Sequence, residues 1–152
     1  MRKSVHDSVL WAAILVLGAM SGSAMAMEDP GGGVSPRDVV AAKFAAANRH
    51  SVEEVVAFYA PDAVVNASDF CAPRQGRAEV ERTYRGIFSF VPDAVVEVQE
   101  YLVQGDRVSV RLTVSSASLG FSVPIMNFFT VRDGQITSDE GRFDNGGRPC
   151  TP

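Results

Sequence analysis

Residues 107–136 read RVSVRLTVSSASLGFSVPIMNFFTVRDGQI, and this stretch decides the fold class. Its first part alternates apolar and polar residues, with Val108, Val110 and Leu112 on one face of an extended chain, which is the period of a half-buried β-strand. Asp133-Gly134 separates two further extended runs, and an Asp-Gly pair in that position indicates a hairpin turn. Together with the run before it, this stretch predicts four consecutive strands, at residues 94–103, 107–115, 121–131 and 135–144.

The residues before these strands carry helix signals. Ser35-Pro36 is typical of a helix start, because Ser caps the first amides and Pro fits the first turn. Ser51 with Glu54 forms a capping box that opens a short second helix, and residues 77–88 have the apolar spacing of a third. Between them, residues 62–68 predict a short strand and residues 69–76 a loop. The chain is therefore expected to be an α+β domain whose helices cover one face of a curved sheet, with a small-molecule cavity at one end.

The first 26 residues have the layout of a secretory signal peptide. Arg2 and Lys3 precede an apolar run, and Ala24-Met25-Ala26 offers a cleavage site after Ala26. An uncleaved membrane anchor is the alternative, but the apolar run is shorter than the roughly 20 residues of a spanning helix. We expect an exported protein, periplasmic or secreted, with a Gly-rich linker at 27–34, a domain at 35–144 and a C-terminal tail at 145–152.

The net charge and the cysteines indicate which partners and which kinds of site to expect. The chain has a net charge of −4, and an acidic, well-mixed surface argues against nucleic acid and against anionic membranes as partners. Cys71 and Cys150 are the two cysteines, and an even number in an exported domain predicts a disulfide. Their spacing does not suit a metal site, and we expect no metal and no cofactor.

Several short motifs, taken in order, resemble the SnoaL-like and ketosteroid-isomerase-like branch of the nuclear transport factor 2 superfamily. These motifs are FYAPDAVV at 58–65, QGR at 75–77, FVPD at 90–93, QGDRV at 104–108 and VRDGQI at 131–136, followed by Asp144. The resemblance implies a cone-shaped barrel, in which a curved and mostly antiparallel sheet wraps around three N-terminal helices. It does not fix a reaction, because this fold carries many activities.

The sequence departs from the ketosteroid isomerases at the positions that carry their chemistry. The resemblance places Ala67 at the position of the carboxylate base, Met126 at that of the oxyanion-hole Asp, and Phe44 at that of the Tyr. All three are apolar, so we do not expect the steroid-isomerase mechanism.

Three carboxylates remain as candidate catalytic residues. Asp144 matches the acid/base Asp of SnoaL-type cyclases, and Glu140 replaces the Trp that commonly lies four residues upstream. Strand alternation would place Arg142 on the same face as both, where its charge favours their ionised forms. Asp69 lies two residues after Ala67 and could replace the missing base. The alternatives are a turn role for Asp69, and solvent exposure or structural ion pairs for the other three.

The predicted pocket lining is apolar with two polar groups. Its expected members are Phe44, Tyr59, Asn66, Tyr84, Phe88, Met126, Phe128 and Arg142. A Cys71–Cys150 disulfide would hold the tail across the pocket mouth.

Three functions are compatible with the predicted fold, pocket and candidate residues. The first is binding of a small apolar or amphipathic molecule, and the second is acid/base catalysis of the cyclase, isomerase, dehydratase or hydrolase type with Asp144. The third is a protein-interaction module that forms a homodimer through an open sheet face carrying Phe129 and Val131.

Overall fold

The structure is a computed structural model, and it describes residues 33–152. The predicted signal peptide and its cleavage site after Ala26 lie outside the described residues. Within the described part of the chain, no helix is long and apolar enough to cross a membrane.

The three predicted helices are confirmed, with the caps that the sequence indicated. Helix α1 spans Pro36–Asn48, and the Ser35 hydroxyl accepts a hydrogen bond from the Asp38 amide. Helix α2 spans Val52–Ala57, and the Ser51 hydroxyl accepts from the Glu54 amide in the same way. Helix α3 spans Arg77–Phe90 and runs two residues beyond its predicted end. Each cap satisfies an amide that has no partner within the helix, and so fixes where the helix begins.

The strands form one curved sheet that does not close. They are β1 (Tyr59–Ala67), β2 (Arg74–Gln75), β3 (Val95–Gln104), β4 (Arg107–Ser116), β5 (Phe121–Arg132) and β6 (Gln135–Arg142). Their order is β2-β1-β6-β5-β4-β3, and all pairs are antiparallel except β1 with β6. The predicted α+β cone fold is therefore confirmed. The sequence missed β2, which lies in the expected loop, and placed the end of β6 two residues too late.

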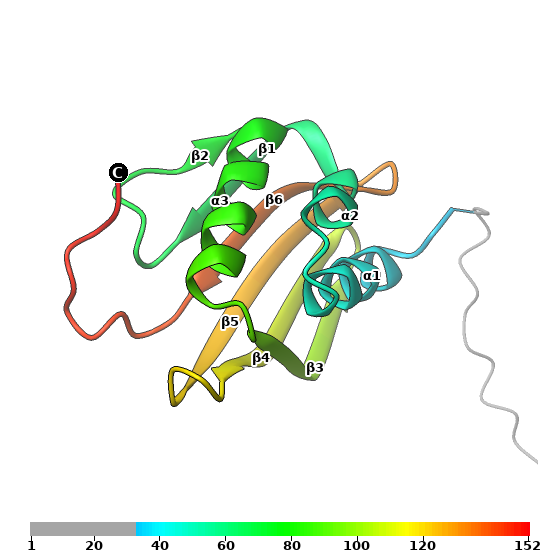
Figure 1. Cartoon of the computed structure of the whole chain (residues 1–152). Helices are drawn as coiled ribbons and strands as arrows, with labels where there is room; N and C mark the ends of the chain where they lie inside the picture. Colours follow the sequence, from blue (N-terminus) through cyan, green and yellow to red (C-terminus); the bar gives the residue numbers. More distant parts are fainter. Residues whose placement is uncertain (1–32) are drawn as a thin grey trace, which may run out of the picture. The chain divides into compact units, whose positions relative to one another are not determined.

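The helices pack on the concave face of the sheet (Figure 1). Phe44 of α1 meets Phe129 of β5 edge to face, with 5.7 Å between ring centroids, and both rings belong to the main apolar core. Val131 lies in the same core. Phe129 and Val131 are only 2% and 3% exposed, so the expectation that they form an outer dimer surface is wrong. Strand β5 carries apolar residues on both faces, and its sequence alone does not show which face turns inward.

An extra residue in β6 reverses the direction in which its side chains point. Thr130 pairs with Ser138, but Val131 pairs with Ile136, so Thr137 has no partner across the strand. A bulge of this kind shifts the alternation by one residue. As a result Ile136 and Asp139, three residues apart, are both buried on the concave side.

The C-terminal tail is tied back to the loop after β1. Cys71 and Cys150 form the predicted disulfide, and the Cys71 amide donates to the Thr151 carbonyl at 3.0 Å. The Thr151 amide donates in turn to the Asp69 carbonyl at 2.6 Å. Figure 1 shows the tail, in red, returning to the side of the domain that carries β2. The loop that follows β1 and the tail that follows β6 are thus joined covalently.

Candidate functional site

A cavity of about 500 Å³ lies between the helices and the concave face of the sheet. Its walls are mostly apolar and come from α1, α3 and the inner faces of β1, β4, β5 and β6. Phe44, Tyr84, Phe88, Leu112 and Ile125 are among these wall residues. A concave apolar space with few polar groups is the usual form of a small-molecule site.

The polar part of the cavity is centred on the Asp139 carboxylate. One of its oxygens, Oδ2, accepts a hydrogen bond of 2.6 Å from the Tyr59 hydroxyl, and the other, Oδ1, accepts one of 2.7 Å from Nδ2 of Asn127. Asp139 is 5% exposed and Tyr59 is fully buried. The carboxylate is therefore held at a fixed position by side chains from β1 and β5.

Lys43 brings a positive charge to the same place. Its side chain projects from the buried face of α1, is 3% exposed, and places Nζ 3.8 Å from Oδ2 of Asp139. The ammonium also lies 4.1 Å from the ring centroid of Phe44 and 5.1 Å from that of Phe129, which are cation–π distances. Lys43, Asn127 and Asp139 all line the cavity, and we call these three residues with Tyr59 the polar cluster.

Burial and charge act on the titration of this cluster. Burial works to lower the pKa of Lys43, but Tyr84 and Asp139 outweigh it and raise the pKa above its ordinary value. Burial also raises the pKa of Tyr59, and the negative charge of Asp139 and its hydrogen bond raise it further. Lys43 is thus charged and Tyr59 is neutral at neutral pH.

The structure separates the three predicted catalytic carboxylates. Asp69 lines the cavity, next to the tail. Asp144 is exposed beyond the end of β6, and its carboxylate accepts a hydrogen bond from the Gly146 amide at 2.8 Å. Glu140 faces away from Asp139, lines a groove of about 580 Å³ on the outer face of the sheet, and forms an ion pair with Arg142.

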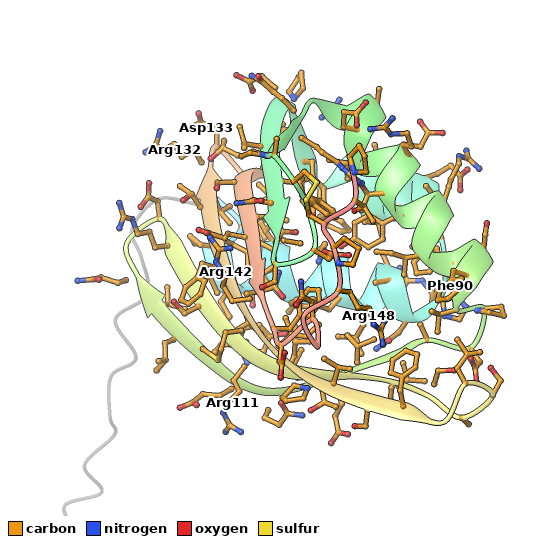
Figure 2. The ribbon with its side chains drawn as sticks, turned by 90° about the vertical axis from the view of Figure 1, so that its left-hand side faces the viewer. Phe90, Arg111, Arg132, Asp133, Arg142 and Arg148 are labelled. Atoms are coloured by element: carbon orange, nitrogen blue, oxygen red, sulfur yellow. A yellow bond between two sulfur atoms is a disulfide. The ribbon has the colours of Figure 1, made fainter. Side chains whose placement is uncertain are left out.

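Of the eight residues predicted to line the pocket, four lie on the wall of this cavity and four do not. Phe44, Asn66, Tyr84 and Phe88 line the cavity, whereas Tyr59 lies behind it as the donor to Asp139. Met126 and Phe128 do not line it, because Ile125 and Asn127 are the members of β5 that turn inward. Arg142 lies half-exposed on the outer face, beside β5 in Figure 2. The same view shows Arg111 on the side of the sheet away from the helices and Phe90 at the far end of α3.

Sequence reasoning missed Lys43, Asn127 as a partner of Asp139, and Asp139 itself. A signal for Lys43 was present, because it stands between Val40 and Ala47 at the spacing of the apolar face of α1. The sequence also has only two lysines, Lys3 and Lys43. Within residues 27–152, Lys43 is therefore the only lysine, and all the other basic side chains there apart from His50 are Arg. Asp139 had no comparable signal, because simple alternation from Ile136 turns it outward.

Comparison with known proteins agrees with the fold. The family profile described as a SnoaL-like domain matches residues 40–139. The chain belongs to the SnoaL-like domain family. A search of the curated proteins found no match to this SnoaL-like protein.

Solved structures of the same fold include two proposed polyketide cyclases. One, from Sinorhizobium meliloti, is 30% identical with a TM-score of 0.62, and the match covers 71% of this chain and 99% of that one. The other, IdmH from Streptomyces antibioticus, is 26% identical with a TM-score of 0.66, covering 74% and 94%. A proposed ketosteroid isomerase from Kribbella flavida, 19% identical with a TM-score of 0.64 over 77% and 83%, shares the fold with the SnoaL-like protein.

Proposed function

We propose that this SnoaL-like domain binds a small, mostly apolar molecule in its cavity, with an oxygen of the ligand directed at the polar cluster. The observation that supports this is an apolar cavity of about 500 Å³ whose only buried charged side chains among the described residues are Lys43 and Asp139. Apolar walls would provide most of the affinity, and a few fixed polar groups would orient the ligand.

The cost of the polar cluster favours a role in recognition. Two charges removed from water lose several kcal/mol of hydration each, and well-packed apolar residues of similar volume often serve stability as well or better. A buried Lys–Asp pair that faces a cavity is therefore weakly explained by stability alone. Binding of a ligand oxygen by the Lys43 ammonium would explain why this buried ion pair faces the cavity.

Native mass spectrometry of protein purified from the export compartment without refolding tests the binding proposal. We expect a retained small molecule, or uptake of an added apolar probe such as decan-1-ol, in a ratio of one per chain. Ala47→Phe fills the cavity from α1 and should abolish uptake. Val103→Phe adds the same ring at an exposed position outside this cavity and should leave uptake unchanged. Equal uptake by both variants would reject the cavity as the site.

Acid/base catalysis in the same cavity is the second candidate. It is favoured by the two proposed polyketide cyclases above 25% identity and by a carboxylate, Asp139, fixed on the cavity wall. The family position of the acid/base residue points instead to Asp144. Asp139→Asn and Asp144→Asn separate these assignments, since the variant that stops turnover of a bound substrate while keeping its affinity identifies the catalytic carboxylate. Loss of turnover in neither variant would argue against acid/base catalysis by either residue.

Export is part of the proposed function. The Cys71–Cys150 disulfide is compatible with an oxidising compartment, and the first 26 residues have the signal-peptide layout. The mass of the mature chain checks this directly. We expect cleavage after Ala26 together with a deficit of two hydrogens, and an intact N-terminus in the cytoplasm would contradict it.

A further inference from the structure

The donor groups of the polar cluster are unequally used. Both oxygens of Asp139 accept short hydrogen bonds from Tyr59 and Asn127. The Lys43 ammonium carries three N–H donors. Its distance of 3.8 Å to Asp139 is too long for a hydrogen bond, and the Tyr84 hydroxyl can accept only one of the three N–H groups, so Lys43 keeps donors for a ligand.

The charges of the cavity lining show which cation is free to act on a ligand. Arg82 is exposed at the mouth and pairs with Glu79, which is outside the lining. The other charged side chains of the lining are Lys43, Arg74, Asp69 and Asp139, two of each sign. Both oxygens of Asp139 already accept hydrogen bonds, so Lys43 is the buried charged group that keeps donors for a ligand, and low dielectric strengthens its attraction for an anion.

We propose that the ligand carries a single oxyanion, either a carboxylate or an enolate, on an apolar body, and that Lys43 recognises it. This inference rests on the proposed binding function and adds the chemical class of the ligand. The oxyanion accepts hydrogen bonds from the N–H groups of Lys43 on the side away from Asp139, while Phe44 and Tyr84 contact the apolar body of the ligand. A neutral ligand oxygen gains only the charge-assisted hydrogen bond from Lys43, whereas an oxyanion also gains the attraction between opposite charges at low dielectric, so the charge of the ligand decides the selectivity.

Matched probes test the carboxylate form. Calorimetry compares decanoate with decan-1-ol, which has the same apolar chain and a neutral head. We expect the wild-type protein to bind decanoate at least about tenfold more tightly, a difference of about 1.4 kcal/mol. Lys43→Met keeps a linear apolar side chain and should remove the preference without weakening decan-1-ol. Arg82→Met removes an exposed cation of the cavity mouth and should leave most of the preference in place.

A second probe tests the enolate form. Benzoylacetone loses a proton to the buffer when it forms its enolate, and the enolate absorbs at a longer wavelength than the neutral form. We expect the wild-type protein to lower the pH at which bound benzoylacetone ionises, and Lys43→Met to restore the value in water. Either result supports an oxyanion ligand. A preference for decanoate would identify it as a carboxylate, and ionisation of benzoylacetone would identify it as an enolate.

A third measurement does not depend on any variant folding. Because Lys43 is the only lysine of residues 27–152, a protein of these residues labelled with ε-¹⁵N-lysine gives a single ammonium signal that needs no variant for its assignment. Decanoate or the enolate should shift this signal, and decan-1-ol should shift it far less. Equal affinity for decanoate and decan-1-ol, no ionisation of the diketone and an unmoved lysine signal would overturn the oxyanion while leaving the binding function in place. Failure of every probe to bind would overturn both.

Discussion

At the scale of single residues, the polar cluster is held by contacts from α1, β1 and β5 that all meet at one side chain of β6. Asp139 neutralises Lys43 and satisfies Tyr59 and Asn127. Its removal therefore affects more than its own contacts. A buried ammonium, a buried hydroxyl and a side-chain amide all lose their partner at once.

Asp139→Ala should be among the most destabilising single changes in the domain. Loss of one partner of a buried ion pair costs about 3–5 kcal/mol, because the remaining charge stays buried without compensation. Urea unfolding measures the loss. The double variant Lys43→Met with Asp139→Leu removes both charges and should recover most of the stability. A double variant as unstable as Asp139→Ala would mean that the charge of Lys43 is not the cause.

Tyr59→Phe should cost less than loss of Asp139. The variant removes one hydrogen bond to a charged acceptor, which is worth about 1.5–3 kcal/mol, and keeps the ring in the core. Equilibrium unfolding checks the value, with Tyr101→Phe as a control because Tyr101 makes no side-chain hydrogen bond among the described residues. Equal effects of the two variants would show that the Tyr59 hydroxyl contributes little.

The candidate site was only partly predictable from the sequence at this scale. Phe44, Tyr84 and Phe88 follow from helical spacing, because the apolar face of a helix is fixed by its period. Phe128 was placed inside and Phe129 outside, and the structure reverses both. When a strand has large apolar residues on both faces, its sequence does not show which face turns inward. Here the packing of α1 against Phe129 determines the inward face.

At the scale of elements, one carboxylate joins the segment after α3 to the turn between β4 and β5. Asp93 accepts hydrogen bonds from the Ser116 hydroxyl at 2.6 Å and from the Ser118 hydroxyl at 2.7 Å and amide at 2.8 Å. These hydrogen bonds favour the charged form and lower the pKa of Asp93 to about 2.

The lowered pKa of Asp93 predicts a loss of stability in acid. A carboxylate with a pKa below its ordinary value of 3.8 stabilises the fold above that pH, and this contribution disappears as the pH falls towards 2. Asp93→Asn should therefore flatten the dependence of the melting temperature on pH between about 4 and 2. Asp133→Asn, in the exposed β5–β6 turn, is the control. An unchanged pH dependence in Asp93→Asn would contradict the assignment.

Most elements could be predicted because their signals are local. The caps at Ser35 and Ser51 and the turn at Asp133-Gly134 depend on a few neighbouring residues, and the structure has all three. The bulge at Thr137 and the two-residue strand β2 depend on distant partners instead. The bulge matters most, because it turns Asp139 into the cavity and Glu140 out of it.

At the scale of the whole domain, the disulfide closes a loop of the chain between two residues 79 positions apart. Reduction should lower the free energy of unfolding by about 2–5 kcal/mol, chiefly because the unfolded chain gains freedom. Thermal unfolding with and without a dithiol reductant measures the change. The Cys71→Ser/Cys150→Ser variant should unfold like the reduced protein and should not respond to the reductant. A response in that variant would point to another effect of the reagent.

Reduction should also change access to the cavity, since Thr151 and Asp69 both line it. Stopped-flow dissociation of a bound fluorescent fatty acid reports this access. We expect faster release from the reduced protein, because the tail between Asp144 and Pro152 is then held to the Asp69 loop by hydrogen bonds alone. Equal release rates in both forms would show that the ligand leaves by another route.

The position of β6 has a consequence for the order of events during folding. Strand β6 comes last in the order of the chain but lies between β1 and β5, so a chain that lacks residues 135–142 has two separate pieces of sheet, β1–β2 and β3–β5. Contacts of such long sequence separation form slowly, because much chain entropy is lost before they are made. The nascent domain can therefore not reach its native state before residues 135–142 have been synthesised. A domain built in this way remains open, and so threadable, until β6 joins the two pieces of sheet.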